Sequence, residues 1–404
     1  MMPPLRRFLC RSYQRIMFLA SFFLPWREPK QLQGLPAIGH TLAGIKKEKP
    51  LIVTDEGLHR LGIDQKLLDT LKEQGYEAAL FHGVAANPTL AMAEEGFKAY
   101  QENGCDCLIG IGGGSAMDAA KAIAIKIAYP KKSLNRFKGI LYVHRRLVPI
   151  FAIPTTAGTG SETTLAAVVV DEKTREKYQI DDPKLIPNYA VFEPSLLANL
   201  PPAVIATTGM DAFTHAIEAY IGGSNTRGTK RAATLAMKLI HDHLLSFYGG
   251  TDREAHAKAM QEAAFLAGVA FTRAYVGYVH ALAHALGGAY NVPHGYANAV
   301  LLPFVLEAYG RPVTKKLAKI HDLLQLGPTS LPEEAKAASF VSYLRRLNQA
   351  MKIDAHFQNL VSEEDFAMLA KRAAKEGNPL YPVPRIMDAR ELEIVLRKAC
   401  GERL

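Results

Sequence analysis

Two stretches in the second half of the chain carry side chains that bind divalent metal ions. Asp211 and His215 are four residues apart, which places both on one face of a helix, one turn apart. His280 and His284 repeat this spacing, and His294 follows in the same apolar tract. A buried carboxylate and buried imidazoles need polar partners, and a shared metal ion is one partner that serves all of them.

The surroundings of these histidines favour a metal site over simple packing. Between Ala263 and Leu306, Arg273 is the only formally charged residue, histidines aside. One histidine in such a tract would be explained as a core residue, and an isolated Asp–His pair by a hydrogen bond. Three histidines in one tract indicate a metal site. Imidazole and carboxylate ligands suit Fe²⁺, Zn²⁺, Mn²⁺ or Co²⁺, and ligand type alone does not choose among them.

A run of glycines in the first half could bind a phosphate group. Gly112, Gly113 and Gly114 lie between a β-rich run and a helical pattern. Their bare backbone allows close approach, and the start of a helix offers free N–H groups. Ser115 and Asp118 fit a Ser-x-x-Asp helix cap. A tight structural turn would explain the glycines equally well, because the third glycine of the common dinucleotide fingerprint is missing.

Two further strand ends carry polar residues. The loop at 154–162 contains three threonines, a serine and two glycines directly after a buried strand pattern. Asp55 ends the first strand pattern, where its carboxylate could bind ribose hydroxyls and repel a 2′-phosphate, which favours NAD over NADP. A helix-capping aspartate is the simpler explanation of Asp55 alone. Because ligands of open α/β sheets bind at strand ends, the loops together favour a ligand site.

The elements that must position these residues change in type along the chain. Strand patterns at 50–54, 78–81, 107–111, 148–153 and 166–170 alternate with helical patterns, but after Pro201 only helical patterns remain. This predicts an α/β fold: a Rossmann-like, doubly wound parallel sheet followed by an all-α part. We expect a basic, apolar extension at 1–30, a dinucleotide-binding domain at 31–200 and a helical metal-binding domain at 201–404.

Charge and cysteine content exclude several classes of protein. The net charge is +9, but residues 1–30 hold six basic residues against Glu28, and the remainder is diluted over the chain. We therefore expect no nucleic-acid partner. The four cysteines are too scattered for a disulfide framework, so we expect reduced thiols in a cytoplasmic protein.

The extension holds an apolar run at 16–26 that is interrupted by Pro25. It is too short to cross a bilayer, which takes about 20 residues, and no signal-cleavage pattern follows it. We expect an amphipathic or packing segment without a transmembrane span. Weak association with a membrane surface through residues 1–27 is the alternative.

Four motifs together resemble the iron-containing (group III) alcohol dehydrogenases, in matching order and separation over about residues 50–305. They are GGGSAMDAAKA (112–122), IPTTAGTGSE (153–162), TGMDAFTHAIEAY (208–220) and GYVHALAHALGGAYNVPHGYANA (277–299). The resemblance implies an NAD-dependent, metal-dependent enzyme. It would interconvert a small alcohol, in particular a primary one, and its aldehyde or ketone by hydride transfer. It also implies a homodimer or larger oligomer.

The resemblance assigns roles to single residues. The metal, Fe²⁺ or else Zn²⁺ or another divalent ion, is held in the family by residues matching Asp211, His215, His280 and His294. His284 matches the residue for substrate contact and proton relay, and Phe271 matches an aromatic packed against substrate. The positions that match the family's cofactor site are Asp55, Gly113, Gly114, Ser115, Asp118, Thr155, Thr156, Thr164, Lys177 and Leu196.

Three other functions remain open on the residues alone. A lyase on the related dehydroquinate-synthase-like scaffold would use NAD without net oxidation. A metal-dependent hydrolase would activate water at the Asp/His cluster and hold a phosphate substrate at the glycines. A non-catalytic binding protein is disfavoured because the ligand positions are intact.

Overall fold

The computed structural model describes residues 2–85, 87–174 and 176–402. It divides into two compact units. The sheet unit spans Pro25–Asn199, and the helical unit combines the chain up to Leu24 with the chain from Leu200 onward.

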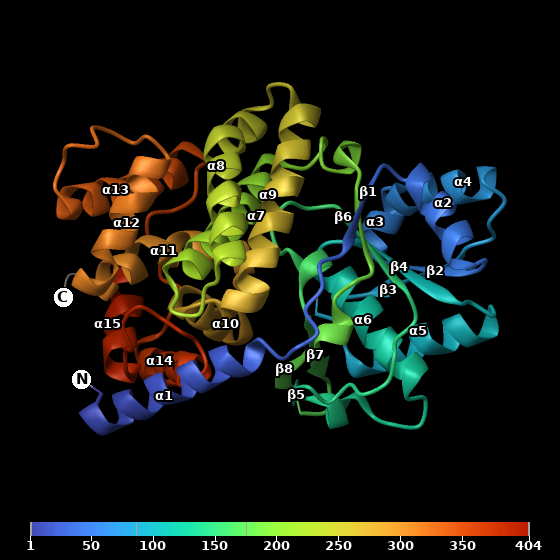
Figure 1. Cartoon of the computed structure of the whole chain (residues 1–404), viewed down its shortest axis with the longest axis horizontal. Coiled ribbons are helices and arrows are strands. Elements are labelled where there is room, and N and C mark those ends of the chain that lie inside the picture. The colour runs from blue at the N-terminus through green and yellow to red at the C-terminus, as the bar shows by residue number, and fades with distance from the viewer. Residues whose placement is uncertain (1, 86, 175, 403–404) are drawn as a thin grey trace. The chain divides into compact units, whose positions relative to one another are not determined.

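The sheet unit is built on six strands in the order β1-β9-β6-β4-β2-β3 (Figure 1). Every pairing in this sheet is parallel. The strands are β1 (Lys30–Gln33), β2 (Pro50–Asp55), β3 (Ala79–Val84), β4 (Cys107–Gly112), β6 (Ile150–Pro154) and β9 (Tyr189–Phe192). The predicted parallel α/β fold is confirmed, and β2, β4 and β6 are neighbours, so their carboxyl ends meet at one edge.

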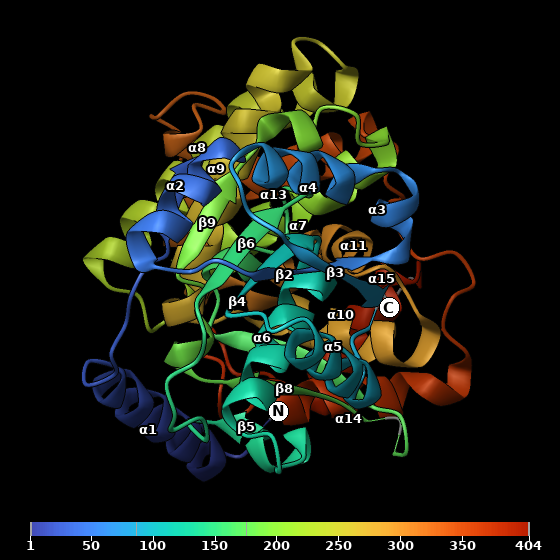
Figure 2. The same cartoon turned by 90° about the vertical axis from the view of Figure 1, so that its right-hand side faces the viewer.

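Helices cover both faces of this sheet. Figures 1 and 2 place α2 and α4 on one face and α5 and α6 on the other. The helices are α2 (Pro36–Ile45), α3 (Glu56–Arg60), α4 (Ile63–Glu73), α5 (Leu90–Glu102) and α6 (Gly114–Ala128). Strands covered on both faces become continuous apolar runs, as the fully buried β4 shows.

A second, smaller sheet lies beyond α6 and has the order β5-β8-β7. Its strands are β5 (Gly139–Ile140), β7 (Ala166–Asp171) and β8 (Glu176–Asp181). The strand predicted at 166–170 therefore forms, but it pairs antiparallel with β8 outside the main sheet. Its residues alternate between fully and partly buried, which suits a sheet with one covered face.

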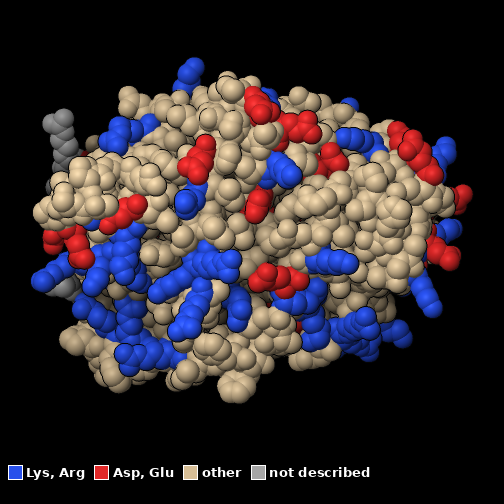
Figure 3. Space-filling view, turned by 45° about the horizontal axis from the view of Figure 1, so that its top comes forward, with Lys and Arg blue, Asp and Glu red and all other residues tan. Residues whose placement is uncertain are grey.

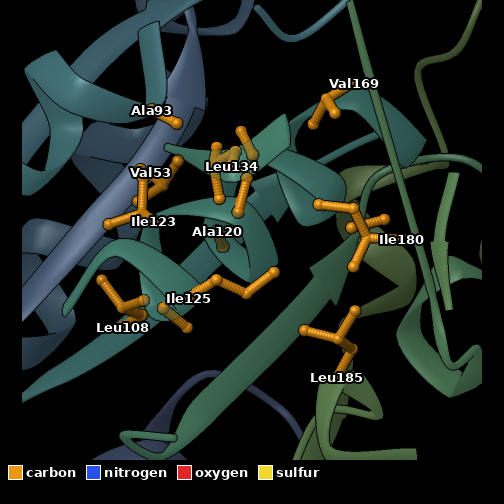
Figure 4. Close-up of a cluster of buried hydrophobic side chains, with 14 of the residues drawn as sticks. Val53, Ala93, Leu108, Ala120, Ile123, Ile125, Leu134, Val169, Ile180 and Leu185 are labelled. Carbon is orange, nitrogen blue, oxygen red and sulfur yellow. The ribbon is translucent and has the colours of Figure 1, made fainter. Parts of the chain in front are cut away.

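One hydrophobic cluster joins these layers (Figure 4). Val53 and Leu108 come from the main sheet, Ile123 from α6, and Val169 and Ile180 from the small sheet. All five side chains are fully buried. This core holds the end of β4 and the start of α6 in a defined position.

The described part of the helical unit folds into ten α-helices. They are α1 (Pro4–Ser21), α7 (Pro202–Ile221), α8 (Arg227–Gly249), α9 (Arg253–Ala274), α10 (Tyr278–Tyr290), α11 (His294–Tyr309), α12 (Arg311–Leu323), α13 (Glu333–Ala350), α14 (Phe366–Gly377) and α15 (Ala389–Ala399). Local signals set several ends. Pro202 occupies the first turn of α7, Thr226 and Thr229 form a capping box at α8, and Gly250 ends α8 in the left-handed conformation.

The first helix is fixed to this unit by hydrogen bonds. The Arg11 guanidinium donates to the carbonyl oxygens of Val383 and Pro384, and the Gln14 amide donates to that of Tyr381, at 2.7–2.9 Å.

Among the described residues no helix is both long and apolar enough to cross a membrane. The face in Figure 3 carries charges of both signs, with Lys and Arg gathered toward its lower left. The positive charge is therefore unevenly distributed.

Candidate metal and cofactor sites

Three helices of the helical unit bring Asp211, His215, His280 and His294 together. Each offers one ligand atom, and the four atoms lie within 4.8 Å of one another. Asp211 and His215 lie one turn apart on α7, His280 lies in the first turn of α10, and His294 begins α11. The predicted ligand set is thus assembled from segments up to 83 residues apart in sequence.

The geometry fits a divalent ion. The Asp211 carboxylate oxygen lies 3.5 Å from His294 Nε2 and 3.9 Å from His280 Nε2. Ligands about 2.1 Å from a shared ion in a tetrahedral set would lie roughly 3.4 Å apart. Asp211, His215 and His280 are buried, and His294 is partly exposed. One carboxylate and three imidazoles match the ligand preference of Fe²⁺ and Zn²⁺.

A buried carboxylate orients His280. Glu218 Oε2 lies 2.6 Å from His280 Nδ1, and the carboxylate also accepts the amide hydrogens of Gly277 and Val279. This contact leaves His280 Nε2 facing the cluster. Burial, followed by the charges of the neighbouring histidines, lowers the pKa of His280 well below its ordinary value. His280 is therefore a neutral imidazole with a lone pair available for a metal.

Two further side chains surround the four donors. The Asn298 amide nitrogen lies 2.8 Å from the Asp211 carboxylate, 3.2 Å from His280 Nε2 and 3.1 Å from His294 Nε2. The Phe271 ring stacks on His215, with 4.1 Å between the ring centroids. Phe271 is partly exposed, so it forms an apolar wall next to the cluster.

His284 lies beside the metal cluster. Its ring stacks on His294 at 5.1 Å between centroids, and its Nδ1 lies 2.7 Å from Glu376 Oε1. The Tyr381 hydroxyl donates to the same carboxylate oxygen at 2.7 Å. Burial opposes ionisation of Glu376, but the His284 charge and the two hydrogen bonds outweigh it and lower its pKa. His284, Glu376 and Tyr381 therefore form a hydrogen-bonded chain that begins next to the cluster.

The sheet unit brings Asp55 and the glycines together at one sheet edge. Gly112 has φ +150°, and a Cβ there would lie 2.6 Å from Ala116 Cβ and 3.7 Å from the Asp55 carboxylate. Only glycine fits this position. A Cβ on Gly113 would meet nothing closer than Thr156 Oγ1 at 3.8 Å. The Gly113 position therefore leaves open space over the backbone.

Asp55 also caps a helix. Its Oδ1 accepts the amide hydrogen of Leu58 at 2.9 Å, at the start of α3. The structural explanation of Asp55 is thus correct. It does not exclude the ribose role, because this hydrogen bond uses one of the two carboxylate oxygens.

The predicted helix cap at Ser115 and Asp118 is wrong. α6 begins at Gly114 with Gly113 as its N-cap, and no side chain makes the capping hydrogen bond. Asp118 instead accepts from the Ser161 hydroxyl at 2.7 Å and the Val168 amide at 3.1 Å. The helix starts two residues earlier than a cap at Ser115 requires, so Ser115 already lies inside it. Asp118 thus ties α6 to the polar loop and the small sheet.

The remaining predicted cofactor residues lie in the same unit. Thr155 and Thr156 directly follow β6, and the Thr155 amide donates to the Gly112 carbonyl at 3.0 Å. Thr164 Oγ1 accepts a hydrogen bond from the buried Lys121 ammonium group.

The last two predicted cofactor residues lie further along the sheet unit. Lys177 lies on β8 and donates a hydrogen bond to Asn87 Oδ1 at 2.8 Å. Burial lowers the pKa of Lys177, against the opposing charge of Asp118. Leu196 follows β9 and is buried.

Sequence reasoning did not single out Glu218, Asn298 or Glu376. Glu218 had a detectable signal, because positions 211, 215 and 218 share one helical face. Asn298 is likewise four residues after His294 on α11. Glu376 had none, since its partner His284 is 92 residues away.

Comparisons with known proteins identify the family of this chain. The family described as iron-containing alcohol dehydrogenase matches residues 31–194, and its C-terminal family matches residues 205–400. The NAD-dependent methanol dehydrogenase of Bacillus methanolicus is 35% identical over 94% of this chain and 100% of its own. The 1,3-propanediol dehydrogenase of Klebsiella pneumoniae is 36% identical over 90% of this chain and 95% of its own.

A solved structure extends the likeness to three dimensions. The crystal structure of a 1,3-propanediol oxidoreductase superposes with a TM-score of 0.89 at 35% identity, and covers 93% of this chain and 100% of its own. The chain belongs to the iron-containing alcohol dehydrogenase family, and it is an oxidoreductase whose cofactors are NAD and a divalent metal ion.

Proposed function

We propose that this enzyme interconverts a small primary alcohol and its aldehyde, with the metal at Asp211, His215, His280 and His294. The observation that carries the proposal is the convergence of these four donors within 4.8 Å, beside a histidine that is hydrogen-bonded to a carboxylate. The relatives act on small alcohols or aldehydes, as their names state.

The bound cofactors supply chemistry that side chains lack. A divalent ion supplies a Lewis acid for the alcohol oxygen, and NAD supplies the acceptor for the hydride. The protein's own part is to hold and orient. Glu218 keeps His280 Nδ1 protonated and Nε2 turned toward the cluster. Phe271, stacked on His215, offers an apolar surface for the carbon chain of a small alcohol.

We assign to His284 the transfer of the hydroxyl proton of the alcohol. Its Nδ1 lies 2.7 Å from Glu376 Oε1, a contact that favours the tautomer with the proton on Nδ1, so Nε2 is the basic nitrogen of the neutral ring. Glu376 stabilises the imidazolium that results, and Tyr381 holds the carboxylate in place. In the oxidation direction His284 would accept the hydroxyl proton of the alcohol, and in the reduction direction it would return that proton to the oxygen of the product, while bound NAD would supply the hydride chemistry.

The loops at the ends of β2, β4 and β6 are the proposed binding site for NAD. The bare backbone at Gly113 and Gly114 and the start of α6 suit a pyrophosphate. The second carboxylate oxygen of Asp55 suits ribose hydroxyls and disfavours NADP. Ser115, Asp118, Thr155, Thr156, Thr164, Lys177 and Leu196 complete the proposed lining.

We place the enzyme in the cytoplasm as a homodimer or larger oligomer. The support for the compartment is that all four cysteines are free thiols. Burial raises the pKa of Cys105 to about 11, so its thiol stays protonated at neutral pH. The oligomeric state follows from the family resemblance, and sedimentation analysis of the purified enzyme tests it.

Metal analysis and a substrate panel test the function. The enzyme is purified anaerobically and aerobically, its metal is measured, and primary alcohols and aldehydes are tested with NAD and NADP. We expect stoichiometric reduced nicotinamide from alcohols with NAD, dependent on the metal. Turnover without reduced nicotinamide would indicate a lyase, and equal turnover with and without nicotinamide a hydrolase. Either result would overturn the proposal.

A further inference from the structure

The first helix and the turn that follows it present an apolar stripe to solvent, interrupted at Ser12. Its members are exposed from 55% at Phe22 to 90% at Phe23. The stripe consists of Leu5, Phe8, Leu9, Ile16, Leu19, Phe22 and Phe23. The five members that precede Ser21 recur at spacings that keep them on one side of α1, and Phe22 and Phe23 follow in the turn after the helix ends. Scattered exposed apolar residues are ordinary, but an aligned row of them marks a binding surface.

The structure fixes the direction in which this stripe points. Cys10 and Gln14 lie on the opposite side of α1 and are buried. Gln14 and Arg11 are hydrogen-bonded to backbone carbonyls at 381–384. Figure 1 draws α1 in blue at the edge of the helical unit. Because one side is held by the protein, the stripe cannot turn inward without breaking these bonds.

Arginines lie along both edges of the stripe. Arg6 directly follows Leu5, and Arg15 directly precedes Ile16. Since successive helical residues turn by about 100°, the two arginines lie on opposite sides of the stripe. Both are exposed, as is Arg7. The chain has no acidic residue before Glu28.

We propose that α1 binds the surface of a membrane that contains anionic lipids. The apolar stripe would enter the boundary between headgroups and acyl chains, while the long arginine side chains reach back to phosphate groups. A second copy of the stripe would bring arginines against arginines, so charge disfavours that occupant. The family model matches from residue 31 onward, so α1 lies outside the residues that it matches.

Co-sedimentation of the full-length enzyme with lipid vesicles tests this proposal. One set contains equal parts phosphatidylcholine and phosphatidylglycerol, and the other phosphatidylcholine alone. We expect sedimentation with the anionic set, and weaker binding to the neutral set by roughly fivefold per engaged arginine. Replacing Phe8, Leu19 and Phe23 together by Ser should weaken binding to anionic vesicles at least about tenfold.

Matched controls separate the stripe from general surface hydrophobicity and charge. The triple substitution of Leu61, Leu235 and Ile394 by Ser removes exposed apolar residues elsewhere and should leave binding unchanged. Arg6→Glu with Arg15→Glu should abolish the preference for anionic vesicles, whereas Arg231→Glu with Arg390→Glu should keep it.

Several outcomes would overturn the proposal. They are no sedimentation with either vesicle set, equal binding to both sets, or a stripe variant that binds as well as the parent. A fourth is an oligomer that the stripe variant dissociates without any vesicle binding, which would identify a second copy as the occupant. Alcohol oxidation measured without vesicles should be the same in the stripe variant, so this test can fail while the proposed activity stands.

Discussion

The two candidate sites are built on opposite principles. In the helical unit, the metal cluster consists of side chains with charge or lone pairs, drawn from three helices and mostly buried. In the sheet unit, the loops after β4 and β6 offer mainly backbone groups and hydroxyls at the ends of neighbouring strands. A metal requires particular donor atoms at particular distances, whereas a dinucleotide requires space over a bare backbone. The two sites should therefore respond to mutation in different ways.

Loss of a metal ligand should give the largest effect. In His280→Ala or His294→Ala we expect bound metal and turnover to be lost together. The loss of metal affinity and of activity should each exceed the roughly 10–100-fold that follows removal of a residue that only orients a metal ligand. Bound metal is measured by elemental analysis, alongside NAD binding by fluorescence. NAD binding should persist, because its proposed site lies in the other unit. Full metal occupancy in either variant would remove that histidine from the ligand set.

His284→Ala should separate the metal from proton transfer. We expect the metal to remain while kcat falls by about a hundredfold to ten-thousandfold, the range for losing a general acid or base. Glu376→Gln should act in the same direction but less strongly, since it keeps the ring in place. If His284→Ala emptied the site while His280→Ala did not, the roles within the pair would be reversed.

Adjacent glycines should behave differently from each other. Gly112 has φ +150°, and in Gly112→Ala the new Cβ would lie 2.6 Å from Ala116 Cβ. We therefore expect the free energy of unfolding to fall by about 1–3 kcal/mol. Gly113 has φ −75° and open space, so Gly113→Ala should fold normally. Its methyl group should instead raise KM for NAD roughly ten- to hundredfold by overpacking the cofactor. Equal effects of the two substitutions on stability would contradict this account.

Glu218→Gln should weaken the metal site through an orienting group. The amide replaces a carboxylate that holds His280 Nδ1 and two backbone amides, so we expect about a 10–100-fold loss of metal affinity. Competition with a chelator measures it. Glu307→Gln is the control on a neighbouring helix, where the exposed carboxylate pairs with Arg345. A metal affinity equal to that of the parent would show that His280 needs no such support.

The last prediction concerns the pH dependence of stability in the sheet unit and leaves both candidate sites unchanged. Burial raises the pKa of Glu162 from 4.5 to about 7. A hydrogen bond to its own backbone and the charge of Lys121 lower the pKa, but burial has the larger effect. The folded state therefore binds more protons than the unfolded state between these values, so the free energy of unfolding falls as pH rises through this window. In Glu162→Gln the free energy of unfolding should depend less on pH. The decrease across this window should be smaller than in the parent by up to ~3 kcal/mol, because one pKa unit corresponds to about 1.4 kcal/mol.

Denaturant unfolding measured at about pH 5 and about pH 8 checks this sign. Parallel pH dependence in the parent and Glu162→Gln would show that Glu162 ionises normally.

Features that depend on neighbouring residues were predicted well from the sequence, and features that depend on distant contacts were not. The strand predicted at 107–111 forms as β4 with one more residue, and the helix predicted after the glycines forms as α6, because apolar periodicity and glycine act over a few positions. β7 was predicted as a strand, yet its membership of a second sheet depends on pairing with β8. The cap at Ser115 and Asp118 was predicted wrongly, because Asp118 makes long-range contacts with Ser161 and Val168 instead.

The amino-acid sequence by itself determined the α/β class, the helical second part and the residue types able to bind a metal. Periodicity and i, i+4 spacing are local properties that survive without a fold. Only the tertiary structure decided that Glu218 orients His280, that Glu376 engages His284 and that the apolar side of α1 faces outward. Each of these depends on which segments distant in sequence pack together, and burial free energy of the whole chain selects that packing.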